Sequence, residues 1–331
     1  MTEPFRALMV EDVGKGTKAG FATLSLDDLP PYPVLVEIQY STVNYKDGLA
    51  VTGRGRIARR LPMVAGLDLA GVVVDSRDPA WKPGDAVIVN GWGLSETEWG
   101  GYSRYQRLKP EWLTRRPEGF SLEETMALGT AGYTAALAVA ALEDWGLIKT
   151  DARPVLVTGA AGGVGSVAVA LLASRGYAVT ASTGRAETRD YLLSLGASET
   201  IDRAALLEKG GPLQKERWAG AVDSVGSVTL ANVLAQTAYG GAVAACGLAG
   251  GADLPATVMP HILRGVALLG VDSVMAPQER RARAWGLLAE SFDRRHFDSM
   301  ARIEPLSRIE ALAEEIVNGR IRGRVVIDVA T

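Results

Sequence analysis

Residues 155–185 read VLVTGAAGGVGSVAVALLASRGYAVTASTGR, in which a short apolar run leads through clustered glycines into a long Ala/Val/Leu segment. The run Val155 to Val157 is typical of a strand that is buried on both faces of a parallel sheet. The segment from Val167 to Ser174 contains no helix breaker. The stretch therefore predicts a strand, a glycine-rich turn, a helix and a second strand.

The glycine-rich turn has the pattern of a dinucleotide-binding site. The hexad 160–165 fits G-x-G-x-x-G except that Ala160 replaces the first glycine. Glycines at such a turn let the backbone approach a pyrophosphate, whose charge is met by free N–H groups and by the helix dipole. The alternative is a βα turn that is only structural. The residues predicted to contact the cofactor here are Ala161, Gly162, Gly163, Val164 and Gly165.

The end of the second strand indicates which nucleotide binds. NAD-binding units place Asp or Glu about 20 residues beyond the glycines, where it bonds the ribose 2′-hydroxyl. This chain has Ser182, Thr183 and Arg185 there. Hydroxyl groups and a guanidinium bind a 2′-phosphate, which a carboxylate would repel, so we predict NADPH as the cofactor. The alternative is that Arg185 is a solvated loop residue.

Composition bounds the class of protein. The chain has 331 residues with 47% hydrophobic residues, enough for two domains with sizeable cores. A net charge of −3 gives no basic field for nucleic acid or an anionic membrane. We expect no targeting or membrane-spanning segment. The single cysteine, Cys246, fits a cytoplasmic protein without an internal disulfide.

A strand-rich part of the chain is followed by a part in which strands and helices alternate. We predict a partly open β-barrel over 1–125, a Rossmann domain over 126–272 and a return to the first domain over 273–331. The fold class is therefore α/β, with the cofactor domain inserted in the other. The main expected strands are 34–40, 69–74, 86–89, 155–158, 178–182, 220–224, 241–246, 266–271 and 323–329, and the expected helices include one that starts at Ser121 and one over 277–292.

This order of domains resembles the medium-chain dehydrogenase/reductase superfamily, whose first domain is GroES-like. Within it the chain resembles the zinc-free acrylyl-CoA reductase branch, grouped with quinone oxidoreductases. That resemblance implies NADPH-dependent reduction of acrylyl-CoA to propanoyl-CoA, and a homodimer formed by pairing of strand 266–271. It is carried by the segments 41–48 (STVNYKDG), 91–93 (GWG), 99–101 (WGG), 129–135 (GTAGYTA) and 182–185 (STGR).

The chain offers few ligands for a zinc ion. A catalytic zinc needs three ligands drawn from Cys, His and carboxylate, and a structural zinc usually needs four cysteines. The chain has one cysteine and two histidines, and neither His261 nor His296 lies in a ligand motif. Asn44 and Asp68 stand in segments where zinc-dependent relatives carry a Cys ligand and a Gly-His-Glu motif. We therefore expect no metal.

Conjugate reduction can proceed without a metal. Hydride adds to the β-carbon, negative charge builds on the thioester oxygen, and the α-carbon then needs a proton. The resemblance places Asn44 and Tyr45 at the cleft, Asn44 as an amide donor and Tyr45 as proton donor or nicotinamide contact. Asp68 is an acid in an apolar run, which is costly unless it is paired or used. Its structural alternative is a partner for Lys46 or for backbone N–H groups.

Two further sets of residues are candidates for ligand contact. The Rossmann strand ends add Leu248, Val271 and Asp272 as cofactor contacts, and the family resemblance implies Thr130 and Arg324 as further ones. An arginine-rich loop and two tryptophans are candidates for coenzyme A, with a solvated charge run and packing aromatics as the alternatives: Arg54, Arg56, Arg59, Trp92 and Trp99.

Two rival functions share the same cofactor. A quinone or enone reductase would use the same hydride geometry on a substrate without coenzyme A. A noncatalytic protein would bind NADPH without oxidising it.

Overall fold

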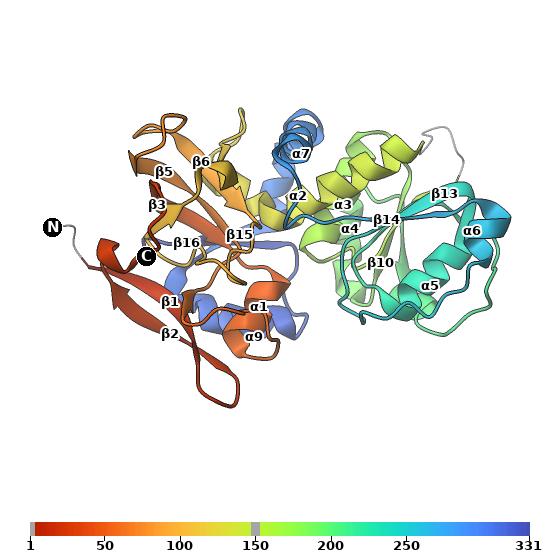
Figure 1. Cartoon of the computed structure of the whole chain (residues 1–331). Coiled ribbons are helices and arrows are strands. Elements are labelled where there is room, and N and C mark those ends of the chain that lie inside the picture. Colours follow the sequence, from red (N-terminus) through yellow and green to blue (C-terminus); the bar gives the residue numbers. More distant parts are fainter. Residues whose placement is uncertain (1–3, 147–152) are drawn as a thin grey trace. The chain divides into compact units, whose positions relative to one another are not determined.

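The computed structural model describes residues 4–146 and 153–331, and the chain divides into two compact units (Figure 1). Unit 1 holds the chain up to Thr130 together with 273–282 and 300–331, and unit 2 holds 131–272 and 283–299. These bounds differ from the expected 1–125, 126–272 and 273–331. Residues 126–130 pack in unit 1 because Thr130 bonds there, and 283–299 pack with the Rossmann unit.

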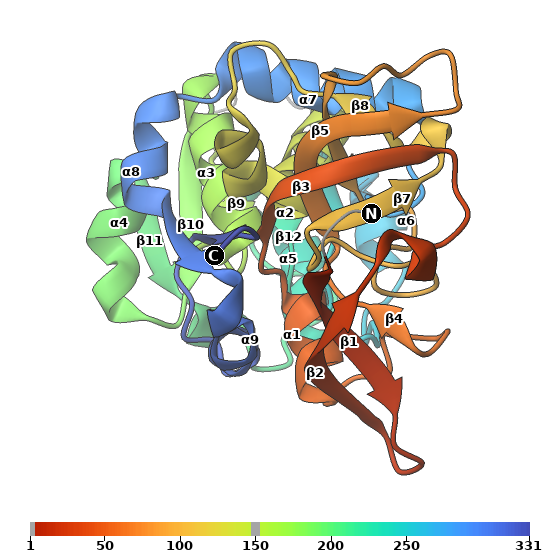
Figure 2. The same ribbon diagram turned by 90° about the vertical axis from the view of Figure 1, so that its left-hand side faces the viewer.

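Unit 1 is built on two sheets that are largely antiparallel (Figure 2). Only the β15–β16 pair of the larger sheet is parallel. The larger sheet has the order β15 (Ala301–Pro305), β16 (Arg324–Asp328), β3 (Val34–Thr42), β5 (Asp68–Ser76), β6 (Ala86–Asn90) and β8 (Thr114–Arg115), with β7 (Tyr105–Leu108) also paired to β3. The smaller has the order β2 (Thr17–Leu24), β1 (Phe5–Asp12) and β4 (Met63–Val64).

Helices α1 (Tyr45–Thr52) and α9 (Ile309–Val317) pack against each other in unit 1. The core of the unit is formed by inward residues of the strands, such as Leu8, Ile38 and Leu69, which are all at most 2% exposed. Three short 3₁₀ turns also lie in this unit: η1 (Leu26–Asp28) and η2 (Pro110–Trp112) between strands, and η6 (Leu306–Arg308) between β15 and α9.

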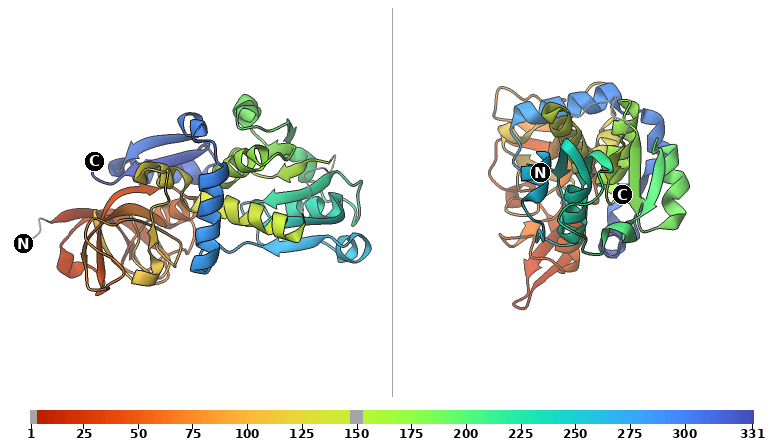
Figure 3. Two further views of the ribbon diagram at one scale, coloured as in Figure 1. Left: turned by 90° about the horizontal axis from the view of Figure 1, so that it is seen from above. Right: turned by 90° about the vertical axis from the view of Figure 1, so that its right-hand side faces the viewer.

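Unit 2 contains a six-stranded parallel sheet with helices on both faces (Figure 3). Strand order reverses between β9 and β12, which is where open α/β sheets bind ligands. The fold class predicted from the sequence is confirmed. The strand order is β11 (Glu199–Asp202), β10 (Val179–Thr183), β9 (Val155–Val157), β12 (Trp218–Asp223), β13 (Thr237–Ala245) and β14 (Ala267–Gly270).

Helix α2 (Leu122–Trp145) is long and apolar enough to cross a membrane, but 83% of that stretch is buried, as in the core helix of a globular protein. A kink at Gly129, with φ 53° and ψ −158°, interrupts it. The remaining helices are α3 (Gly163–Ser174), α4 (Arg189–Ser194), α5 (Ser227–Gln236), α6 (Met259–Arg264), α7 (Gln278–Ser291) and α8 (Phe297–Met300), with the 3₁₀ turns η3 (Ala186–Thr188), η4 (Arg203–Leu206) and η5 (Arg294–His296).

Candidate functional site

Asp68 is the centre of a buried polar network in unit 1. Its side chain is completely buried at the start of β5. It accepts hydrogen bonds from the Nδ2 atoms of Asn44 and Asn90, both at 2.7 Å, and from the backbone N (3.0 Å) and Oγ1 (2.5 Å) of Thr130. Such donors compensate a buried carboxylate for its lost hydration. Asp68 is therefore partnered within the protein, by one backbone N–H group and three side-chain donors.

The partner of Asp68 is not Lys46, which was one of the expected alternatives. Lys46 Nζ lies 2.6 Å from Glu96 Oε1. The donors around Asp68 come instead from two side-chain amides and Thr130.

Asp47 is a second buried acid in this network, and no feature of the local sequence distinguishes it. It accepts the backbone N–H groups of Asn44 and Leu67, both at 2.9 Å, and lies 3.1 Å from Asn44 Nδ2. Burial and then the Asp68 carboxylate raise the pKa of Asp47 to about 7, against the opposing effect of these hydrogen bonds. We call the network the acid–amide cluster: Asn44, Asp47, Asp68, Asn90, Thr130 and Arg324.

Asn44 joins the two acids of the cluster. Its Nδ2 donates to both carboxyl groups, and its Oδ1 lies 3.3 Å from Arg324 Nη1. Both amide hydrogens are thus used within the protein, which counts against the predicted donation to a thioester oxygen. Asn44 instead fixes the start of α1, where Tyr45 stands.

Tyr45 is exposed where its neighbours are buried. It occupies the first position of α1 and is 43% exposed. Its hydroxyl makes no hydrogen bond to any residue that the structure describes. This O–H group is therefore available to a ligand.

Arg324, the basic member of the cluster, is only 3% exposed. Its guanidinium donates to the carbonyl oxygens of Ala127 and Val43 and to Thr42 Oγ1, the last at 2.7 Å. A Cβ at Gly129 would lie 2.7 Å from Arg324 Nη2, so the kink of α2 needs glycine. Burial counts against the predicted direct contact of Arg324 with the cofactor.

The tryptophans predicted for coenzyme A differ in their surroundings. Trp99 packs against three apolar clusters of unit 1, which supports the packing alternative. Trp92 has φ 55° and lies under Arg281, whose Cζ is 4.2 Å from the ring centroid. Arg281 is itself buried and donates to the carbonyls of Asn90 and Val274. Arg281 therefore orders the Trp92 loop, a role that the sequence did not reveal.

The arginine-rich loop is partly neutralised. Arg54 lies 2.6 Å from Glu314, and Arg59 lies 3.7 Å from Glu96. Arg56 is exposed and has no ion pair or hydrogen bond to the described residues. It is the one of the three predicted arginines whose guanidinium is unpaired in the part of the chain that the structure describes.

In unit 2 the glycine-rich turn has the form that a pyrophosphate needs. Gly162 precedes α3, and no side chain of the described residues caps this end. The N–H groups of the first turn have no partner within a helix, so they and the dipole can meet an anion. A Cβ at Gly165 would lie 2.4 Å from Gly159 O, so this glycine lets helix and turn pack closely. The residues present fit a dinucleotide.

At the end of β10 the structure adds a residue to the prediction. Arg185 donates to Ala161 O at 3.2 Å, and its backbone N–H donates to Thr183 Oγ1. A Cβ at Gly184 would lie 2.3 Å from Arg203 Nε, so the Arg203 side chain covers this segment. The parallel pairing of Thr183 with Asp202 brings Arg203 here. The sequence signal for Arg203 is its position directly after β11, the strand that follows β10 in the chain.

The other predicted cofactor residues of unit 2 follow β13 and β14. Leu248 is 63% exposed and Asp272 is exposed, whereas Val271 is half-buried. All three lie beyond the carboxyl ends of these strands, which is the side of a Rossmann sheet where ligands bind. Their contact with the cofactor stays a prediction.

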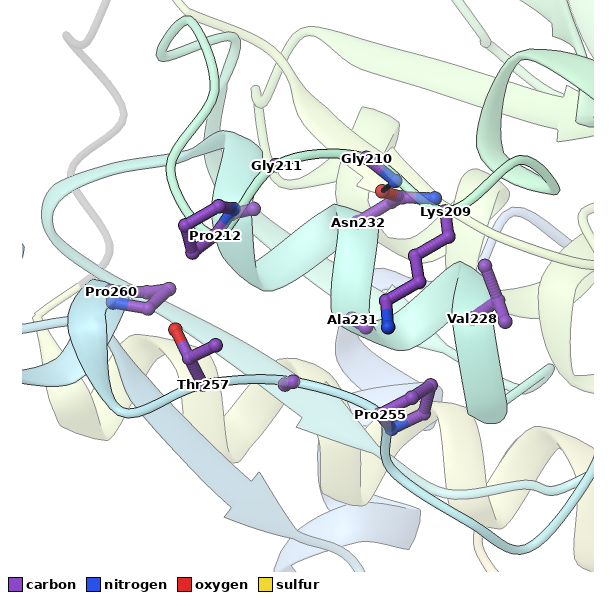
Figure 4. Close-up of a pocket in the computed structure, with 12 residues that line it drawn as sticks. Lys209, Gly210, Gly211, Pro212, Val228, Ala231, Asn232, Pro255, Thr257 and Pro260 are labelled. Carbon is purple, nitrogen blue, oxygen red and sulfur yellow. Dashed lines mark hydrogen bonds between the residues drawn. The ribbon is translucent and has the colours of Figure 1, made fainter.

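A pocket of about 130 Å³ lies elsewhere in unit 2 (Figure 4). Its lining comes from α5, from residues 209–212 and from residues 255–260. It includes no residue of the glycine-rich turn and none from the end of β10. We assign it no part in cofactor binding.

The histidines have structural contacts. His261 Nδ1 lies 2.7 Å from Val266 O, and the ring of His296 stacks edge-on with Phe292. Within 4–146 and 153–331, no group of three or more His, Cys, Asp or Glu could hold a metal ion.

Family comparisons agree with this architecture. Residues 30–138 match the family model of the alcohol dehydrogenase GroES-like domain, and residues 163–290 match that of the zinc-binding dehydrogenases. The fold and these matches define a medium-chain dehydrogenase/reductase.

Similar proteins narrow the class. Acrylyl-CoA reductase AcuI of Ruegeria pomeroyi is 52% identical over 98% of this chain and 99% of its own. The yhdH oxidoreductase of Salmonella enterica, solved in complex with NADP, has a TM-score of 0.95 and 47% identity over 98% and 99% of the two chains. Bacillus subtilis yhfP, solved with NAD bound, has a TM-score of 0.95 and 43% identity over 99% and 100%. The chain belongs to the acrylyl-CoA reductase family, as the sequence motifs predicted.

Proposed function

We propose that this protein reduces the carbon–carbon double bond of acrylyl-CoA to give propanoyl-CoA, with NADPH as the hydride donor. The observation that carries the proposal is the 52% identity to the Ruegeria pomeroyi acrylyl-CoA reductase over 98% of the chain. The quinone reductase alternative is less specific, since it rests on relatives such as the putative quinone oxidoreductase YhfP at 44% identity.

NADPH is favoured over NADH by the end of β10. The first turn of α3 would hold the pyrophosphate, and Ser182, Thr183, Arg185 and Arg203 would surround the 2′-phosphate. Bound NADPH supplies hydride to the β-carbon of the substrate. NADPH carries a 2′-phosphate where NADH carries a hydroxyl. The two guanidinium groups and two hydroxyls proposed to lie here would bind the charged phosphate more strongly than the hydroxyl.

Tyr45 is the proposed proton donor to the α-carbon. Tyr45 is 43% exposed and its hydroxyl has no partner among the described residues, whereas Asn44 and Asp47 beside it are buried. The residues of the acid–amide cluster act as positioning residues, because Asn44 and Asp47 hold the first turn of α1. Arg56 is proposed to meet a phosphate of coenzyme A, since it is exposed and unpaired among the residues described.

The purified protein, mixed with NADPH and acrylyl-CoA, tests this function through the loss of nicotinamide absorbance and the appearance of propanoyl-CoA. Turnover of quinones or free enones in place of acrylyl-CoA would support the first rival. Tight NADPH binding without oxidation by any acceptor would support the second. We also propose that no metal takes part, so activity should survive a chelator.

Assembly and location remain proposals as well. We propose a cytoplasmic homodimer in which β14, an edge strand of the sheet, pairs with its copy. Ile262 and Leu263 of the adjacent α6 are 73% and 56% exposed, which supports an apolar interface. Light scattering that gives a monomer at micromolar concentration would contradict the dimer.

A further inference from the structure

A buried acid stands where the strand order of the Rossmann sheet reverses. Asp223 is the last residue of β12, and it is completely buried. Its strand lies between β9, which leads into the glycine-rich turn, and β13. The crevice at this switch point is the ligand-binding place of such sheets.

Both oxygens of the Asp223 carboxylate hold the neighbouring chain. Oδ1 accepts Thr158 Oγ1 at 2.6 Å, and Oδ2 accepts the Gly226 N–H at 2.8 Å. Thr158 Oγ1 in turn accepts the Ser224 N–H at 3.1 Å, so its own hydrogen is left for Asp223. These donors fit an ionised carboxylate. Burial raises the pKa of Asp223 and makes this charge costly.

Thr158 connects this carboxylate to the glycine-rich turn. Gly159, the next residue, has φ 59°, and a Cβ there would lie 2.5 Å from Ser224 Oγ. Ser224 Oγ donates to Thr158 O at 3.0 Å, so Thr158 is bonded twice to Ser224 of the β12–α5 loop and once to Asp223 of β12. Gly159 O accepts the Gly162 N–H at 2.9 Å. The position of Thr158 therefore sets where α3 begins.

We propose that Asp223 and Thr158 are positioning residues for the dinucleotide, which hold the first-turn N–H groups of α3 where the pyrophosphate binds. The same contacts also satisfy the N–H groups of Ser224 and Gly226, so loss of the pair should affect both the stability of this loop and the position of the turn. The proposal rests on nicotinamide dinucleotide binding by this protein. Because NADPH and NADH share the pyrophosphate, loss of the pair weakens both, in contrast to loss of the residues at the end of β10.

The experiment compares three variants by nicotinamide fluorescence titration, without acyl-CoA. Thr158→Val keeps the shape but removes the hydroxyl, Thr158→Ser keeps the hydroxyl, and Asp223→Asn removes one acceptor. We expect Thr158→Val and Asp223→Asn to raise the Kd of NADPH and of NADH about tenfold each, the scale of one hydrogen bond to a charged group. Thr158→Ser should stay within about twofold, and the double variant should bind no more weakly than the worse single one.

Thr237→Val is the matched control. Thr237 is equally buried, and its Oγ1 donates to Val233 O at 2.8 Å, at the other end of the sheet. Thermal unfolding of the ligand-free variants measures stability separately from binding. The proposal is overturned if folded Thr158→Val binds both nucleotides as the unaltered protein does, or if Thr237→Val weakens binding equally. An unaltered protein that binds neither nucleotide would remove the proposed function and this inference together.

Discussion

The acid–amide cluster of unit 1 and the glycine-rich turn of unit 2 handle polar groups in opposite ways. In the cluster, two buried carboxyl groups are surrounded by side-chain and backbone donors. In the turn, α3 begins at Gly162 with no side chain of the described residues as a cap. The cluster is closed on itself, whereas the turn leaves backbone donors for an anion.

This difference separates residues that fix a structure from residues that meet a ligand. A substitution in the cluster should lower the free energy of unfolding, because it leaves buried partners unsatisfied. A substitution near the end of β10 should instead change nucleotide affinity. Tyr45 is the exception in unit 1, because it adjoins the cluster but is exposed.

The largest effect is expected from Tyr45→Phe. The change removes only the hydroxyl, so if that group delivers the proton, kcat for acrylyl-CoA should fall by about 10²- to 10⁴-fold. NADPH affinity should change little. Tyr239→Phe, at a tyrosine of unit 2 that is 77% exposed, is the control. Undiminished turnover in Tyr45→Phe would assign the proton to water and leave Tyr45 as a contact residue.

The next effect is on stability. Asp68→Ala leaves the donors of Asn44, Asn90 and Thr130 without their acceptor, and we expect the free energy of unfolding to fall by about 3 to 5 kcal/mol. Denaturant titration followed by circular dichroism measures it. Asp75→Ala, at an exposed acid of the same strand, should change it by less than about 0.5 kcal/mol. Equal stability of the two variants would contradict the view that Asp68 stabilises the protein by satisfying the buried donors of the cluster.

The two regions were not equally predictable from sequence. The turn was predictable because its backbone geometry needs glycine. Clustered glycines between a strand and a helix are therefore a direct sequence signal for it. An acid in an apolar run likewise marked Asp68 as paired or used, but its partners Asn90 and Thr130 lie 22 and 62 residues away. No local pattern gives such partners, so Asn44 was assigned to a ligand whereas its amide binds two acids.

Long-range pairing also explains the omission of Arg203 and Arg281. Arg203 reaches the end of β10 only because β10 and β11 pair in parallel register. Arg281 reads in the sequence as one charge of a charged helix, yet it is 2% exposed. Burial of a cation among carbonyl groups depends on the packing of segments that are distant in the chain.

Arg185→Ala tests the proposed nucleotide contacts at the end of β10. It should weaken NADPH binding by about 1.5 to 3 kcal/mol, the range for a hydrogen bond to a charged group, and leave NADH binding nearly unchanged. Arg203→Ala should act in the same direction, and Lys215→Ala, an exposed cation of the same unit, should have no effect. Isothermal titration with both nucleotides measures this. Equal loss for NADPH and NADH would contradict the assignment of Arg185 to the 2′-phosphate.

The smallest effect concerns the pH dependence of the stability that Asp47 of the acid–amide cluster contributes. Burial and Asp68 raise the pKa of Asp47 to about 7, well above its ordinary value, so the folded protein keeps this proton at a pH where the unfolded chain has lost it. The stability that this group contributes is therefore complete below about pH 4 and is lost as the pH rises through 7. Between pH 5.5 and 6.5 the contribution should fall by about 1 kcal/mol. Asp47→Asn cannot titrate, so its free energy of unfolding should gain on that of the unaltered protein across this interval, whatever the absolute cost of the substitution. Denaturant titrations of both proteins at the two pH values measure the difference, and parallel changes with pH would show that Asp47 is ionised throughout.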